Sequence, residues 1–209
     1  MKRLAAIHLL ILATISQLAN PVLGVVIDDF SVGSVSVSSF DPVDQTGLDA
    51  NHVLGGARRI DISSYGGGSQ VLSIESDQLQ FSSAGWGYFD VTYGAAQPLG
   101  VDLTQGGHDR LLIRFGEVGP GFHPFGAYVS LPTNSSSNGE SMYIQDSWDG
   151  LLVEIPYSRF PVSFTNVSSI TLHAVRNPAG SGFAIESVIL AGPPWTAITI
   201  AMAASTPQT

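Results

Sequence analysis

Short runs of alternating apolar and polar residues, separated by turn-forming residues, constrain the fold of this chain more than any other feature. Beyond the first two dozen residues, no stretch keeps the i, i+3, i+4, i+7 apolar spacing of an amphipathic helix. The alternating runs are bounded instead by Gly, Ser, Asn, Asp or Pro. Because a period of two places successive side chains on opposite faces of a strand, the pattern predicts an all-β protein.

The predicted strands follow one another without an intervening helix, and parallel strands need such crossover helices. Glycine-rich segments such as Tyr65–Ser69 and Gln105–Asp109 suit tight turns. We therefore expect an antiparallel β-sandwich. Its predicted strands are Val25–Phe30, Arg59–Ser63, Val71–Glu75, Leu79–Ser82, Tyr88–Tyr93, Leu99–Leu103, Arg110–Phe115, Ala127–Leu131, Ser141–Gln145, Leu151–Ile155, Ile170–Val175 and Phe183–Leu190.

The start of the chain has the pattern of an export signal. Lys2 and Arg3 precede an apolar run, and small residues follow near Gly24. The run is shorter than the roughly 20 residues of a membrane-spanning helix. We expect residues 1–24 to be a signal peptide, 25–192 one sandwich domain and 193–209 a flexible tail. A retained N-terminal anchor is the alternative. The mature chain, without a membrane span, would be secreted, extracellular or periplasmic.

Composition limits the partners of the chain. There is no cysteine, so neither disulfides nor thiolate chemistry can operate, and 8 basic residues stand against 17 acidic ones for a formal net charge of −9. Such a chain repels nucleic acid phosphates and anionic lipid. It is compatible with neutral polymers and divalent cations, and the sequence predicts no nucleic acid partner.

The segment from Trp148 to Phe160 contains a short predicted strand, with a glycine turn before it and a proline at its end. Leu151, Val153 and Ile155 are predicted to point one way, and Leu152 and Glu154 the other. Pro156 cannot donate to the ladder and is expected to end the strand. Tyr157 and Phe160 would then fold back over the sheet edge, which requires no chemistry.

Several segments, in this order, resemble the galactose-binding-like jelly rolls, especially carbohydrate-binding modules and the domain of complex I intermediate-associated protein 30. These segments are Val26–Phe30 ("VIDDF"), His52–Gly56 ("HVLGG"), Val153–Phe160 ("VEIPYSRF") and Gly182–Leu190 ("GFAIESVIL"). The chain is also similar to small exported bacterial proteins that end in a Pro-Glu-Pro sorting signal, but no Pro-Glu-Pro follows Gly192. The resemblance implies a non-catalytic jelly-roll domain. Members bind sugar on a concave sheet face or at the loop ends, and many hold a structural calcium ion.

An aromatic and polar set of residues points away from the predicted core. Trp86, Tyr88, Asp90 and Thr92 share one parity in their strand, opposite to the core-like Phe89, Val91 and Tyr93. Sugar rings stack on aromatic planes, while polar side chains direct hydrogen bonds to hydroxyls. If their strands share one sheet, the predicted ligand-binding residues are Trp86, Tyr88, Asp90, Arg114, Tyr128, Tyr143 and His173, with Gln145 beside them. Trp148 is a second aromatic candidate. The alternative is that Trp86 and Tyr88 merely cap the sandwich or lie under a loop.

No cofactor is predicted, but a structural calcium ion is a hypothesis. Asp28 and Asp29 near one end and Glu186 near the other resemble the family pattern, in which the first and last strands share an ion. Calcium takes roughly six to eight oxygen ligands. Asp41, Asp44 and Asp49 offer further carboxylates, without EF-hand spacing. Ordinary turn and capping aspartates are the alternative. The basic pair Arg58-Arg59 is expected to hold Asp61 or a loop carboxylate.

Catalytic signals are weak. The histidines show no H-E-x-x-H or other metal-ligand spacing, and no G-x-S-x-G elbow is present. Glycoside hydrolysis needs two carboxylates at a defined separation, which sequence cannot place; Glu117, Glu140, Glu154 and Asp146 are the available acids.

The sequence therefore predicts a secreted, non-catalytic module that binds a glycan or cell-surface polysaccharide. A structural or adhesive component of the envelope or matrix is the alternative. An enzyme acting on polysaccharides is the third hypothesis.

Overall fold

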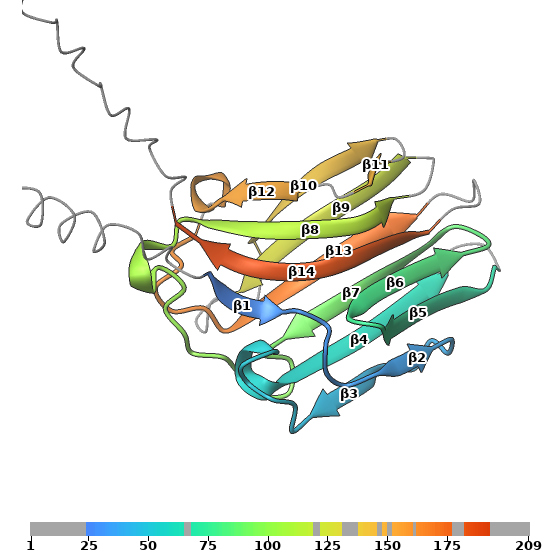
Figure 1. Cartoon of the computed structure of the whole chain (residues 1–209), viewed down its shortest axis with the longest axis horizontal. Helices are drawn as coiled ribbons and strands as arrows, with labels where there is room; N and C mark the ends of the chain where they lie inside the picture. The colour runs from blue at the N-terminus through green and yellow to red at the C-terminus, as the bar shows by residue number, and fades with distance from the viewer. Residues whose placement is uncertain are drawn as a thin grey trace, which may run out of the picture.

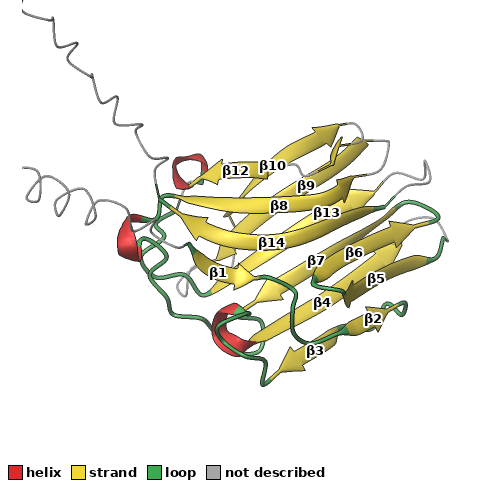
Figure 2. Ribbon diagram, in the orientation of Figure 1, coloured by secondary structure: helices red, strands yellow, loops and turns green. Residues whose placement is uncertain are grey.

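The computed structural model describes residues 24–64, 68–118, 122–130, 138–145, 148–149, 152–160, 162–176 and 182–192. For Glu117, Arg176 and the segments 122–130, 138–145 and 148–149, it describes the backbone alone. The described chain forms two antiparallel sheets that pack face to face (Figure 1). Short 3-10 turns at Leu54–Gly56, Gln105–Gly107 and Tyr157–Arg159 lie in the connections between strands (Figure 2). The predicted all-β sandwich is confirmed.

Sheet A has the strand order β11-β8-β14-β6-β5-β2, with β1 also paired to β14 and β12 to β8. Its strands are β1 (Val25–Asp28), β2 (Val35–Val37), β5 (Gln70–Glu75), β6 (Gln78–Ser83), β8 (Arg110–Val118), β11 (Trp148–Asp149), β12 (Leu152–Pro156) and β14 (Phe183–Ala191).

Sheet B has the order β10-β9-β13-β7-β4-β3. Its strands are β3 (Val43–Thr46), β4 (Ala57–Ser64), β7 (Gly87–Tyr93), β9 (Phe122–Ser130), β10 (Asn138–Gln145) and β13 (Ser169–Arg176). Consecutive strands cross between the sheets: β4 in sheet B is followed by the β5–β6 hairpin in sheet A, then β7 in B, β8 in A and β9–β10 in B. The chain then crosses to β11 and β12 in A, β13 in B and β14 in A, which is the jelly-roll arrangement predicted from the resemblance.

Most predicted strands are present, but one is wrong and three were missed. Leu99–Leu103 forms no strand; Val101 makes an isolated bridge to Val167 instead. The strands β2, β3 and β11 were not predicted, since they have only two to four residues each. The turn predicted at Tyr65–Ser69 lies largely outside the described residues.

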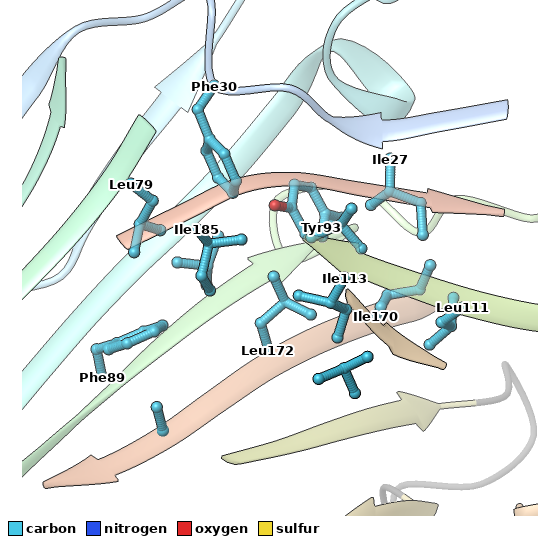
Figure 3. Close-up of a cluster of buried hydrophobic side chains, with 14 of the residues drawn as sticks. Ile27, Phe30, Leu79, Phe89, Tyr93, Leu111, Ile113, Ile170, Leu172 and Ile185 are labelled. Atoms are coloured by element: carbon cyan, nitrogen blue, oxygen red, sulfur yellow. The ribbon is translucent and has the colours of Figure 1, made fainter. Parts of the chain in front are cut away.

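The core consists of the inward-facing side chains of both sheets. Ile113 and Ile185 of sheet A meet Phe89, Ile170 and Leu172 of sheet B (Figure 3). Phe183 contacts Phe81, Phe89 and Phe115, with ring centroids 5.8 to 6.0 Å apart. Apolar burial of this kind stabilises the fold by about 25 cal/mol per Å².

The segment that follows β12 packs as predicted. Val153 and Ile155 are buried, whereas Leu152 and Glu154 are exposed. β12 ends at Pro156, and Tyr157 then stacks on Phe164 with ring centroids 3.9 Å apart. Phe160 meets the same ring edge-on at 5.1 Å. The proline and the aromatic residues after β12 are therefore explained by the end of the strand and by packing of the rings.

A fully buried ion pair joins the two sheets. Arg58 of β4 donates from Nη1 to Asp28 Oδ2 of β1 at 2.6 Å, and both side chains are inaccessible to solvent. Tyr93 of β7 donates its hydroxyl to the same oxygen at 2.9 Å, and the Phe30 amide donates to Asp28 Oδ1 at 2.8 Å. Burial raises the pKa of Asp28, and these donors oppose that rise.

The remaining Arg58 donors are also satisfied. Nε donates to Gln45 Oε1 at 2.7 Å, and Nη2 donates to the carbonyl oxygens of Val32 and Gly33 at 2.6 and 3.1 Å. Gly33 has φ of 71°, and a Cβ there would lie 2.9 Å from Arg58 Nη2, so the site requires glycine. The network thus ties β1 and the loop after it to β3, β4 and β7. The basic pair Arg58-Arg59 was expected to hold Asp61 or a loop carboxylate. This is wrong for Arg58, whose partner is the core-facing Asp28, whereas Arg59 binds Asp44 of the Asp-rich segment after β2.

We expect Arg58→Met to lower the free energy of unfolding by about 3–5 kcal/mol, because it leaves Asp28 buried without a counter-ion. Arg59→Met is the matched control: Arg59 pairs with Asp44 on the exposed side of the same strand and its loss should cost about 1 kcal/mol or less. Urea denaturation of the two variants measures the difference. Equal losses would contradict a structural role for the buried pair.

Candidate functional site

The outer face of sheet B carries a polar and aromatic surface. In β7, Phe89, Val91 and Tyr93 are buried, while Tyr88, Asp90 and Thr92 lie on the opposite side and are partly accessible. The predicted parity of this strand is therefore correct. We call the surface the polar face and define it by Arg59, Asp61, Ser63, Tyr88, Asp90, Thr92, Thr171, His173 and Val175.

Strand register brings these residues into rows that cross the sheet. Asp61 of β4 lies opposite Asp90 of β7, which lies opposite His173 of β13. On one side is the row Arg59, Thr92 and Thr171, and on the other the row Ser63, Tyr88 and Val175. Tyr88, Asp90 and His173, predicted separately from sequence, thus lie together because β7 and β13 are neighbours.

His173 is held in place from two sides. Its Nδ1 lies 2.6 Å from Asp90 Oδ1, and its ring lies 5.5 Å from the Tyr88 ring with an interplanar angle of 38°. A hydrogen bond from Nδ1 to a carboxylate requires the proton on Nδ1, so Asp90 selects that tautomer when the imidazole is neutral. In the adjacent row, the Thr92 and Thr171 hydroxyl oxygens are 3.0 Å apart. The polar face therefore combines a flat aromatic pair with oriented polar groups.

Asp61, which was not predicted as a ligand-binding residue, belongs to this face, and Arg59 joins the face to Asp44 at its edge. Arg59 binds Asp44 of β3 in a bidentate pair, with Nε and Nη2 each 2.8 Å from a carboxylate oxygen. Asp61 is partly accessible, and burial raises the pKa of its carboxyl, with Asp90 and Asp44 adding to the rise and Arg59 opposing it. Alternation within Arg59–Ser63 was the available signal, since it places Asp61 on the outer side of a predicted strand.

Trp86 lies at the margin of the face. It directly precedes β7 and is 48% exposed. The alternative that Trp86 caps the sandwich is disfavoured by this exposure. A large apolar side chain that is left accessible beside polar groups is typical of a contact surface.

Two further predicted residues are placed by register alone. Tyr128 of β9 lies opposite Thr171, and Tyr143 of β10 lies opposite Pro124 of β9. β9 and β10 belong to sheet B, as the hypothesis of one shared sheet requires. The side chains of Tyr128, Tyr143, Gln145 and Trp148 lie outside the described part of the structure.

Arg114 does not belong to this surface. It lies on β8 in sheet A, where its side chain is 61% exposed and its Nε is 4.0 Å from Glu186 Oε2. A hollow of about 390 Å³ beside it is lined by Leu112, Arg114, Leu152, Glu186, Ser187 and Ile189. The outward direction of Arg114 was predicted correctly. The sheet to which β8 belongs could not be predicted, because that depends on its pairing with distant strands. The structure therefore separates Arg114 from the other predicted residues.

A second cavity, of about 410 Å³, lies at one end of the sandwich. It is lined by Thr46, Gly47, Gly55, Gly56, Ala57, Arg58, Val101 and the segment 94–99. None of the predicted ligand-binding residues contributes to it, and its walls are mostly small, uncharged residues.

Asp28, Asp29 and Glu186, the three acids of the family-like calcium pattern, each have a partner within the protein. Both Asp28 oxygens accept hydrogen bonds in the buried network, and Asp29 Oδ2 lies 2.7 Å from His52 Nδ1. Glu186 is on the outer face of sheet A with Arg114. Among the described residues, no group of three or more His, Cys, Asp or Glu side chains is arranged to hold a metal. These residues do not fit an ion shared by the first and last strands.

The acids considered for hydrolysis are not gathered on the polar face. Glu154 lies on β12 in sheet A and accepts a hydrogen bond from Arg110 at 2.8 Å. Glu117 and Glu140 have only their backbones described, and Asp146 lies outside the described residues.

The similarities found among known proteins are to solved structures. No protein-family model matches the sequence, and no curated protein is similar enough to count as a relative. The chain is similar to the family 11 carbohydrate-binding module from Clostridium thermocellum, in complex with a β-1,3-1,4-mixed-linked tetrasaccharide, at 16% identity over 80% of this chain and 94% of that one, with a TM-score of 0.42.

Two other similar structures differ in their described roles. TmCBM61, in complex with β-1,4-galactotriose, shares 13% identity over 75% of this chain and 92% of its own, with a TM-score of 0.37. The xyloglucanase domain of NopAA, a type three effector from Sinorhizobium fredii, shares 8% identity over 76% and 99%, with a TM-score of 0.44. The jelly-roll sandwich predicted from the resemblance rests on the strand order of the two described sheets.

We expect EDTA to leave the melting temperature of the protein unchanged, because the Asp28 oxygens are already satisfied by protein donors. An ion bound only by the folded state would raise the melting temperature. Calorimetry with EDTA, and again after calcium is restored in excess, makes the comparison. A fall in EDTA that calcium reverses would contradict this assignment.

Proposed function

We propose that this protein is an exported, non-catalytic module that binds a glycan across the polar face of sheet B. The observation that carries the proposal is the aromatic pair Tyr88–His173, fixed by Asp90 in the middle of an accessible sheet face. Sugar C–H faces stack on aromatic rings, and the polar groups in the neighbouring rows match hydroxyls. Trp86 extends the aromatic surface at one end.

Rigidity of the face supports a binding role. The three central strands, β4, β7 and β13, are hydrogen-bonded neighbours whose inner side chains are in the core. Side chains that are already held by one another lose little conformational freedom when a ligand binds. A row of hydroxyls and an aromatic pair on such a scaffold suits an extended polymer with many hydroxyl groups.

Export is part of the same proposal. β1 begins at Val25, one residue after the predicted cleavage point at Gly24, so removal of the signal leaves every described strand intact. Within the described residues, no helix is long and apolar enough to cross a membrane. The absence of cysteine is consistent with a domain that relies on its core and the Arg58–Asp28 pair outside the cell.

We expect the double variant Trp86→Ala and Tyr88→Ala to weaken glycan binding at least about tenfold, since a stacked ring contributes about 0.5–1.5 kcal/mol beyond its buried area. A glycan array followed by calorimetry on the best ligand measures it. Phe40→Ala is the matched control, because Phe40 is 57% exposed and lies outside the polar face. Affinity that survives the double substitution would remove this site.

The same samples also test the two alternative functions, an enzyme that acts on polysaccharides and a structural or adhesive protein. Release of reducing ends from a bound polysaccharide would show an enzyme in place of a binding module. Concentration-dependent self-association, without glycan affinity, would favour the structural or adhesive role.

A further inference from the structure

The described side chains of the polar face leave one carboxylate, that of Asp61, without a direct cationic partner. The Arg59 guanidinium is committed to Asp44 through two hydrogen bonds of 2.8 Å, and the His173 imidazole is committed to Asp90. Asp61 lies between these pairs, opposite Asp90 in the register. Among the described residues, no hydrogen-bond donor contributes to the electrostatic environment of the Asp61 carboxylate, and the nearest cation, Arg59, acts on it only at a distance.

This arrangement has a cost to the fold. Carboxylates directly opposite each other on neighbouring antiparallel strands are mutually destabilising. The proximity of Asp90 and Asp44 raises the pKa of Asp61, as does its partial burial. A serine or threonine at position 61 would avoid that repulsion, and both residue types occupy outer positions in the two flanking rows, at Ser63 and Thr92. The carboxylate therefore has no evident structural purpose at the centre of the face.

We propose that Asp61 determines ligand specificity by favouring glycans that carry ammonium groups, the class of partly or fully deacetylated amino sugars. The inference rests on the proposed function, because it takes the polar face as the glycan site. An ammonium group on the ligand would donate hydrogen bonds to Asp61 and place a positive charge next to its carboxylate. A uronate or sulfated sugar would instead meet the Asp61–Asp90 pair with like charge.

The charge of the whole chain acts in the same direction. A formal net charge of −9 attracts a polycation from a distance and repels a polyanion. The aromatic pair near Asp61 provides a stacking surface for the amino sugar ring itself, since His173 lies in the same row beyond Asp90 and Tyr88 lies in the adjacent row. Stacking and charge thus recognise two different parts of the same sugar unit.

The test compares glycan hexamers of different charge, and the variants at Asp61 and Asp77 separate the effect of charge from the other differences between the sugars. Calorimetry of the full chain at low salt with glucosamine hexamer, N-acetylglucosamine hexamer and galacturonate hexamer, together with the best neutral glycan from the array, gives the ranking. We expect glucosamine hexamer to bind at least about fivefold more tightly than its acetylated counterpart, a ratio that shrinks as salt screens the charges. Asp61→Asn should abolish the ratio, so that the two hexamers bind with equal affinity.

Asp77→Asn is the control. It removes the same charge from the exposed turn between β5 and β6 in sheet A, so it should preserve the ratio. Equal or tighter binding of neutral glycans by the unmodified protein would overturn the amino sugar proposal and leave the proposed function standing. A ratio unchanged in Asp61→Asn would overturn the role of Asp61. No binding to any glycan would overturn both.

Discussion

The buried pair of Arg58 and Asp28 is the interaction on which the arrangement of the two sheets depends. It joins β1 of sheet A to β4 of sheet B, in a chain that has no cysteine with which to form a disulfide. Because successive side chains of β4 point to opposite faces, Arg59, the residue after Arg58, points outward and binds Asp44 of β3. Two consecutive residues thus act on opposite sides of sheet B. Arg58 binds Asp28 in the core, and Arg59 belongs to the candidate ligand surface, where Asp44 holds its guanidinium.

Sequence reasoning succeeded where the required information lies within one strand. The alternation of Tyr88, Asp90 and Thr92 against Phe89, Val91 and Tyr93 was enough to predict both the core and the polar face of β7. His173 was predicted by the same argument applied to β13. The apolar run after Trp148 was correctly interpreted as a terminated strand, since the inability of proline to donate is a local property.

It failed where the result depends on which distant segments pair. Arg114 has the predicted outward direction, yet β8 joins sheet A and carries it to the other side of the molecule. Asp28 belonged to a plausible calcium pattern, but its partner, thirty residues away, is a core arginine that no local pattern reveals. Asp61 was overlooked because its importance comes from lying opposite Asp90.

The central claim is that the accessible face of β4, β7 and β13 binds the ligand, and an amide NMR titration with the best glycan from the array tests it most directly. The account predicts that the largest shift changes lie in these three strands and around Trp86, with little change in sheet A. Changes confined to the cavity near Gly55 and Gly94, or to the hollow beside Arg114, would contradict it.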